Sequence, residues 1–128
     1  MTDKAERNIR NVHGLYEMAF NDGQPRRATE LFVGDHYIQH NPLVGDGIEP
    51  FVDYFERMAR EHPTKRLEIK RTFTDGDFVI LHCYQHWPDD QDYAGMDIFR
   101  CDENGKVVEH WDVLQVIPPG SANSNGMF

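Results

Sequence analysis

The stretch DIFRCDENGKVVEHWDVLQ, residues 97–115, decides the fold class of this protein. Two runs rich in β-branched and aromatic residues flank Asn104-Gly105, a pair that typically closes a tight β-hairpin. A second hairpin signal, Asp75-Gly76, lies between two similar runs upstream. The predicted strands cover residues 66–74, 78–87, 93–101 and 106–117. Because the hairpin connections are short, we expect these strands to be antiparallel neighbours.

The first half of the chain shows helical periodicity instead. Apolar residues at three- and four-residue spacing predict helices over residues 4–21, 25–32 and 48–62, with a short strand at 37–40 that Asn41-Pro42 ends. Helices therefore come first and strands follow. This order predicts an α+β fold in which about three N-terminal helices pack on one face of a curved antiparallel sheet.

Length and composition favour one compact domain. The 128 residues include 39% hydrophobic residues, enough for a core, and we expect a single domain at 1–117 followed by an irregular tail at 118–128. The net charge of −9 disfavours nucleic acid and anionic membranes, and we interpret the only basic cluster, within 65–71, as a solvated sheet edge. Cys83 and Cys101 fit reduced thiols of the core or of a pocket wall.

The location of the protein is predicted from two further features of the sequence. No apolar run approaches the length of about 18 to 20 residues that a bilayer requires. The polar N-terminal segment MTDKAERNIRNV does not have the pattern of a secretory signal peptide. We therefore expect a cytoplasmic protein without a membrane partner.

Three segments together resemble one protein family. They are YIQHNPLVGDG at 37–47, GDFVILH at 76–82 and the stretch at 97–115. The chain resembles the SnoaL-like polyketide cyclases of the nuclear-transport-factor-two-like superfamily, and its ending SANSNGMF is similar to a subgroup of predicted aldol-condensation enzymes. The resemblance implies a cone-shaped α+β barrel with a ligand pocket between sheet and helices, and a homodimer formed through the outer sheet face.

The resemblance also implies the chemistry. These cyclases need no metal or organic cofactor, and Asp112 matches their pocket aspartate, a general acid and base for aldol ring closure. Asp97 matches the protonated aspartate that donates to an enolate oxygen in ketosteroid isomerase, a member of the same superfamily. Asn41 stands where that isomerase has its base. An amide cannot abstract a proton, so we expect Asn41 to be a polar contact.

Strand periodicity gives an independent view of the last strand. Alternation places His110 and Asp112 on one face and Trp111 and Val113 on the other. Both faces mix polar and apolar residues, so the residues alone leave open which face is inward; the resemblance assigns His110 and Asp112 to the pocket. They form either an acid–base pair or a buried hydrogen-bonded pair that only fixes the core.

Other candidate residues belong to the pocket wall. Asp97 lies in an apolar strand, so it is protonated, paired with a pocket histidine, or at the rim. Tyr16 also suits a core position, and Asn41 before Pro42 also suits a turn. The predicted pocket wall consists of Tyr16, His40, Asn41, Phe55, His82 and Phe99.

A metal site is the less favoured interpretation of the histidines. His82 and His86 lie four residues apart, but on a strand they would be separated by about 13 Å and could not share one ion. A site that combines His82 with His110 and Asp112 stays geometrically open. We predict no bound metal and no cofactor.

The sequence supports three functional hypotheses. The first is a cofactor-free enzyme that enolises a small carbonyl compound, followed by aldol-type cyclisation or isomerisation, with Asp112, His110 and Asp97 as catalytic residues. The second is a protein of the same fold that only binds a small hydrophobic ligand. The third is an interaction module that dimerises through the Trp111 face.

Overall fold

The computed structural model describes residues 2–128, which form three helices and five strands. The helices are α1 (Asp3–Phe20), α2 (Pro25–Phe32) and α3 (Ile48–Glu61). The strands are β1 (Val33–Gln39), β2 (Arg66–Asp75), β3 (Phe78–His86), β4 (Tyr93–Cys101) and β5 (Val107–Val116). Each predicted helix and each of the four predicted C-terminal strands is present, and the α+β fold class is confirmed. The first strand is longer than predicted because it begins directly after α2.

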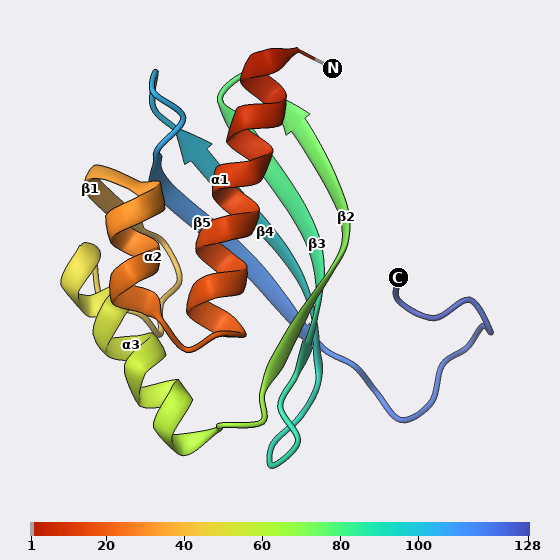
Figure 1. The fold of residues 1–128 in the computed structure, drawn as a ribbon. Coiled ribbons are helices and arrows are strands. Elements are labelled where there is room, and N and C mark those ends of the chain that lie inside the picture. Colours follow the sequence, from red (N-terminus) through yellow and green to blue (C-terminus); the bar gives the residue numbers. More distant parts are fainter. Residues whose placement is uncertain (1) are drawn as a thin grey trace.

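The five strands form one curved sheet in the order β1-β5-β4-β3-β2. From β2 to β5 all neighbours are antiparallel, as the hairpin signals predict, with Gly76 at φ 59° and Gly105 at φ 80° in the two turns. The parallel pairing of β1 with β5 was not predicted. The sheet curves around the helices without closing into a complete barrel (Figure 1).

The helices cover the concave face of the sheet. Helix α1 crosses this face, and α2 and α3 lie beside it (Figure 1). Every third or fourth residue of α1 and α3 is apolar, so each helix turns one stripe toward the sheet. The core formed in this way includes Val12, Leu15, Ala19, Val52, Val79, Leu81, Cys83, Phe99, Cys101 and Val107. Both cysteines are buried free thiols, as expected.

Strand β2 is an edge strand, which agrees with the expected solvated edge, but one member of its basic cluster is buried. Lys65 is only 7% exposed, and its Nζ donates a hydrogen bond to the carbonyl of Phe20. This carbonyl is in the last turn of α1, where helix carbonyl groups lack partners within the helix. Lys65 therefore caps α1, and burial lowers its pKa.

Residues 117–128 form no helix or strand and lead away from the sheet (Figure 1). The chain returns at its end, where the Phe128 ring stacks on Tyr84 at 4.7 Å between ring centres and lies 5.2 Å from His82. The tail end thus contacts the outer face of the sheet. Within residues 2–128, no helix is both long and apolar enough to cross a bilayer.

Candidate active site

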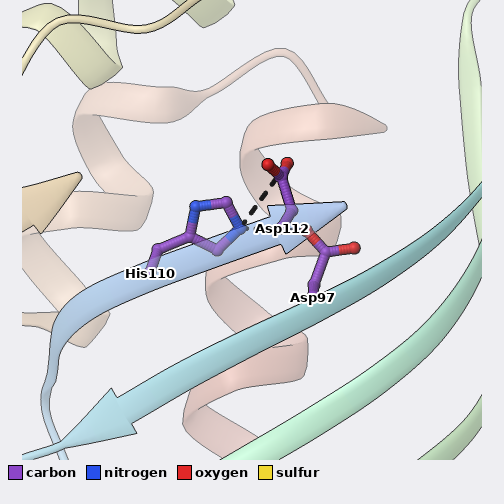
Figure 2. A group of neighbouring side chains, drawn as sticks. All are labelled: Asp97, His110 and Asp112. Carbon is purple, nitrogen blue, oxygen red and sulfur yellow. Dashed lines mark hydrogen bonds and ion pairs between the residues drawn. The ribbon is translucent and has the colours of Figure 1, made fainter. Parts of the chain in front are cut away.

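Two aspartates and one histidine meet on the concave face of the sheet. Asp97 on β4 and Asp112 on β5 are direct cross-strand partners, and like charges in such positions repel each other. His110 Nε2 lies 2.9 Å from Asp97 Oδ1 and 3.9 Å from Asp112 Oδ2 (Figure 2). A proton on this ring nitrogen would face both carboxyl groups and offset their repulsion.

Asp97 is fully buried. Its Oδ1 accepts a hydrogen bond from the Tyr16 hydroxyl at 3.0 Å and also contacts His110, whereas Oδ2 has no hydrogen-bond partner among residues 2–128. An isolated buried carboxylate is unfavourable, and a contact of 2.9 Å between a carboxyl oxygen and a ring nitrogen requires a proton between them. The Asp97–His110 pair therefore holds a proton that either member can carry.

Asp112 lies at the wall of a cavity, with its side chain 7% exposed. Its Oδ2 accepts a hydrogen bond from Asn41 Nδ2 at 3.0 Å. Burial raises the pKa of Asp112 above its ordinary value, and the nearby Asp97 raises it further, while His110 and the bond from Asn41 oppose the shift only in part. This carboxyl can thus gain and lose a proton more readily near neutral pH than an exposed aspartate.

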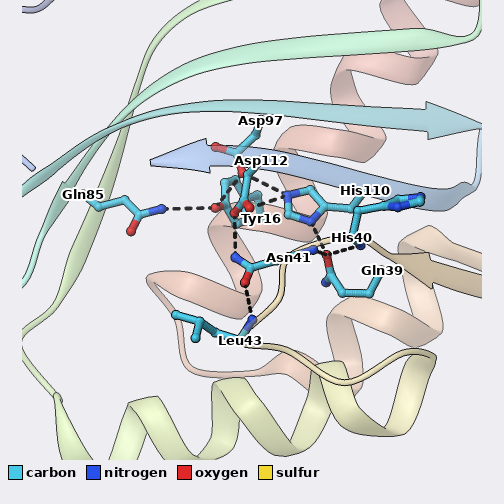
Figure 3. A network of polar contacts seen from close by, with 9 residues as sticks. All are labelled: Tyr16, Gln39, His40, Asn41, Leu43, Gln85, Asp97, His110 and Asp112. Carbon is cyan, nitrogen blue, oxygen red and sulfur yellow. Dashed lines mark hydrogen bonds and ion pairs between the residues drawn. The ribbon is translucent and has the colours of Figure 1, made fainter. Parts of the chain in front are cut away.

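Asn41 is held in the orientation in which its amide nitrogen points toward Asp112. Its Oδ1 accepts a hydrogen bond from the backbone N–H of Leu43 at 2.8 Å, which leaves the amide nitrogen to donate to Asp112 (Figure 3). The turn after β1 therefore contributes a neutral donor to the cluster.

A second polar chain reaches the cluster from the opposite side. Trp87 Nε1 donates to Gln85 Oε1 at 3.0 Å. Gln85 Nε2 in turn contacts the Tyr16 hydroxyl at 3.4 Å (Figure 3). Burial raises the pKa of Tyr16 well above its ordinary value. The hydroxyl therefore stays protonated and can donate to Asp97.

A cavity between the sheet, α1 and α3 borders this network. Its volume is ≈ 40 Å³, which is room for a few water molecules and much less than a typical ligand pocket. The lining residues are Tyr16, Phe20, Tyr37, Gln39, Asn41, Val44, Phe51, Tyr54, Phe55, Gln85, Trp87, Phe99, His110, Asp112 and Leu114. Most of this wall is aromatic, so the polar groups face an otherwise apolar space.

An outer hollow adjoins the cavity and has a volume of ≈ 330 Å³. The two spaces share four lining residues, Tyr54, Gln85, Trp87 and Leu114. The remaining wall of the hollow is formed by Leu43, Met58, His62, Asp90 and Tyr93. A ligand with a ring can therefore fit in the hollow, while only a small group reaches the inner cavity unless side chains move.

The structure brings most of the predicted site residues together. Asp97, His110 and Asp112 form the cluster, and His110 and Asp112 do lie on the inward face of β5, as the resemblance implied. The predicted wall residues that line the cavity are Tyr16, Asn41, Phe55 and Phe99. Two predicted wall residues lie elsewhere.

The structure places two of the residues expected in the pocket wall, His40 and His82, away from the cavity. His40 follows β1 with the opposite orientation to Gln39 and Asn41; it bonds Glu109 at 2.8 Å and stacks on Trp111 at 4.7 Å outside the pocket. His82 lies on the outer face of β3, where it bonds Arg71. Apolar residues occupy both faces of β3, so the sequence of that strand did not reveal its inward side.

Gln39, Gln85 and Trp87 were not predicted as pocket residues, although all three line the cavity. Trp87 precedes a Pro-Asp-Asp loop, a position that fits the mouth of a pocket or the surface; the ring is only 7% exposed and lies where the cavity meets the outer hollow. A signal was present for Gln39, because the strand period of two places it on the same face as Asn41.

The cluster has a geometry that could also hold a cation. One ligand atom from each of Asp97, His110 and Asp112 lies within 4.8 Å of the others, and these residue types bind divalent metals. An ion there would have to replace the existing bond between His110 Nε2 and Asp97 Oδ1. The three-residue site that was left open at His82 is not formed, because His82 is on the other face of the sheet.

Comparisons with known proteins point to one domain type. A family model described as a SnoaL-like domain matches residues 12–110, a segment that contains the whole Asp97–His110 pair. A search of curated proteins finds no match.

Several solved structures have the same fold. A proposed polyketide cyclase from Bacillus cereus is similar with a TM-score of 0.75 and 18% identity, over 89% of this chain and 78% of that one. A proposed SnoaL-like polyketide cyclase from Jannaschia has a TM-score of 0.73 and 15% identity, over 89% of each chain. AclR from Streptomyces galilaeus, a proposed hydroxylase, has a TM-score of 0.68 and 18% identity, over 88% and 91%. These proteins share the fold and have been linked to different reactions.

Proposed function

Since the chain belongs to the SnoaL-like domain family, we propose that it is an acid–base enzyme that enolises a small carbonyl compound, leading to aldol-type cyclisation or isomerisation. The observation that carries the proposal is Asp112, a carboxyl with a raised pKa at the wall of an aromatic cavity and beside a proton-holding pair. General acid–base catalysis by such a group typically accelerates a reaction by about 10²- to 10⁴-fold.

The proposed reaction begins at Asp112. Its carboxylate removes a proton from the carbon next to the substrate carbonyl, and negative charge develops on the carbonyl oxygen. The proton shared by His110 and Asp97 can then be donated toward that oxygen through His110 Nε2, which already lies 3.9 Å from Asp112. Asn41 holds the Asp112 carboxyl in place. The protein's own side chains supply every proton transfer in this scheme.

The two adjoining spaces suggest how a substrate would bind. The inner cavity of ≈ 40 Å³ suits a single small polar group such as a carbonyl, and the outer hollow of ≈ 330 Å³ suits an apolar body. Both walls are rich in aromatic residues, which favours a neutral, partly hydrophobic molecule.

Proton exchange provides the direct test. Ketones incubated with the protein in D₂O should lose the NMR signals of their α-protons faster than in buffer alone, and Asp112→Asn should abolish this acceleration. Asp22→Asn replaces an exposed aspartate and serves as the matched control. A folded Asp112→Asn variant with full exchange activity would remove Asp112 from the mechanism.

A non-catalytic ligand-binding protein is the second candidate, favoured by the predominance of aromatic residues in the cavity wall. The two candidates differ in how the buried groups titrate. In the enzyme, neutralising Asp112 should change the pH dependence of the His110 ring resonances, because the two groups share one site. If the His110 signals ignore Asp112→Asn, the binding function becomes the better explanation.

We also propose a homodimer formed through the outer face of the sheet. Large apolar side chains are exposed there, namely Phe73, Phe78, Met96 and Val113. Val113 is 74% exposed on this face beside Met96, whereas Trp111 is partly covered by the stacked ring of His40. A second copy would remove these side chains from water.

A further inference from the structure

Gln39 has an unusual number of hydrogen bonds at one atom. Its side-chain Oε1 faces the backbone N–H of His40 at 3.1 Å, the backbone N–H of Asn41 at 3.0 Å and the ring nitrogen Nδ1 of His110 at 2.8 Å. Gln39 ends β1 and pairs directly with His110 on β5, which brings the two side chains together (Figure 3). The sequence analysis did not predict this contact between Gln39 and His110.

The two backbone donors determine which end of the amide faces His110. A backbone N–H can only donate, so the atom that faces both of them must be the amide oxygen. With the amide nitrogen in that position, three donors would face one another. The amide orientation therefore follows from the backbone.

The amide orientation in turn determines where His110 carries a proton. Because Gln39 Oε1 can only accept, His110 Nδ1 must donate and must carry a hydrogen. The other ring nitrogen, Nε2, faces Asp97 Oδ1 at 2.9 Å and Asp112 Oδ2 at 3.9 Å. Only Nε2 is then free to gain or lose a proton within the site.

We propose that Gln39 is a positioning residue that fixes the His110 ring with a hydrogen on Nδ1, so that Nε2 alone exchanges protons with Asp97, Asp112 and a bound substrate. The role in catalysis rests on the proposed enzyme function. The position of the hydrogen does not, and it can be measured without a substrate.

Two substitutions separate this role from a structural one. Gln39→Glu keeps an oxygen acceptor for all three donors, and Gln39→Leu has a similar size but no acceptor. Both replace the same contact between β1 and β5, so a purely structural role would depend on packing and not on the acceptor. Gln91→Leu, in an exposed loop, makes the same chemical change away from the site.

The experiment is nitrogen NMR of the imidazole rings in the full chain, labelled with ¹⁵N. In the wild type and in Gln91→Leu, we expect His110 to show a slowly exchanging Nδ1–H signal and, in its neutral form, a hydrogen on Nδ1 and none on Nε2. Gln39→Glu should retain the Nδ1–H signal. Gln39→Leu should lose it and shift the neutral ring toward the Nε2–H form.

The outcomes are decisive for the proposal. A neutral wild-type ring with its hydrogen on Nε2 would overturn it, and so would an unchanged Nδ1–H signal in a folded Gln39→Leu variant. If Gln39→Leu does not fold, the wild-type and Gln39→Glu spectra still decide where the hydrogen lies. If the spectra agree with the expectation but no ketone exchanges protons, the enzyme function fails and the positioning of His110 stands.

Discussion

The two faces of strands β4 and β5 carry similar ionic pairs in opposite surroundings. On the inner face, His110 Nε2 lies 2.9 Å from Asp97 Oδ1, and both side chains are buried. On the outer face, Arg100 Nε lies 2.8 Å from Glu109 Oε1, and the arginine is one-third exposed. The distances are nearly equal, but only the inner pair lies beside a cavity and a further carboxyl. Geometry alone therefore does not distinguish a site from a surface ion pair.

The pKa values of the two carboxyl groups on β5, Glu109 and Asp112, are shifted in opposite directions. Burial acts to raise the pKa of Glu109, but hydrogen bonds from His40 and Arg100 outweigh it and the pKa is lowered. Burial raises the pKa of Asp112, and one histidine and one neutral amide do not offset it because Asp97 adds a like charge. A carboxyl with enough cationic partners stays ionised, while a carboxyl with too few becomes a proton carrier.

The largest expected effect is on activity. Asp112→Asn should reduce the proposed α-proton exchange by about 10²- to 10⁴-fold because it removes the base. Glu109→Gln, three residues away on the outer face, should leave the exchange rate unchanged. Deuterium incorporation followed by NMR measures both. If both variants lost the same share of the exchange rate, the inner carboxyl would have no special role in the reaction.

Removal of a buried partner should have the next largest effect, on stability. Asp97→Ala leaves the Tyr16 hydroxyl without an acceptor and His110 Nε2 without its hydrogen-bond partner, both in a buried site, and we expect a loss of about 3–5 kcal/mol in the free energy of unfolding. On the outer face, Glu109→Ala should cost less than about 1 kcal/mol, since the ion pair is accessible to water and salt. Urea denaturation measures both values. An outer loss as large as the inner one would contradict this prediction.

The two carboxyls should also change stability with pH in opposite directions. The folded pKa of Asp112 is above its ordinary value of 3.8, so its ionisation destabilises the fold at neutral pH and the penalty disappears as pH falls below that value. Asp112→Asn should therefore stabilise the fold at neutral pH and lose this advantage in acid.

Glu109 provides the opposite case for the same experiment. Its lowered pKa means that it stabilises the fold above its ordinary value of 4.5 and loses this contribution as pH falls. Glu109→Gln should thus be less stable than the wild type at neutral pH, with a smaller difference in acid. Thermal unfolding of the three proteins between neutral pH and about pH 3 provides the measurement, and parallel curves would refute the assigned shifts.

The smallest effect on the stability of the fold is expected from the exposed apolar side chains of the outer sheet face, Phe73, Phe78, Met96 and Val113. Val113→Lys should change the stability of one subunit by no more than about 0.5 kcal/mol, because the side chain is already exposed. It should nevertheless convert the proposed dimer to monomers in sedimentation velocity. Gln91→Lys adds the same charge in a loop and should leave assembly intact. A Val113→Lys protein that remains dimeric would place the interface elsewhere.

The sequence was sufficient to predict the fold class and most of the chemistry-bearing residues. Helical spacing and the Asn104-Gly105 hairpin act over short distances, so the helices and the antiparallel strands could be located from local patterns. The period of two also placed His110 and Asp112 on one face of the same strand. The family resemblance was needed to identify that face as the inner one.

Only the tertiary structure decided which residues complete the site. The parallel pairing of β1 with β5 joins segments about 70 residues apart and brings Gln39 to His110, and no local pattern encodes that register. The same is true of Gln85 and Trp87, and of His82, which the sequence suggested for the pocket and the sheet places outside it. Periodicity shows which residues share a face. The packing of helices on the curved sheet determines which face is buried, and burial next to a cavity is what makes Asp112 a candidate proton carrier.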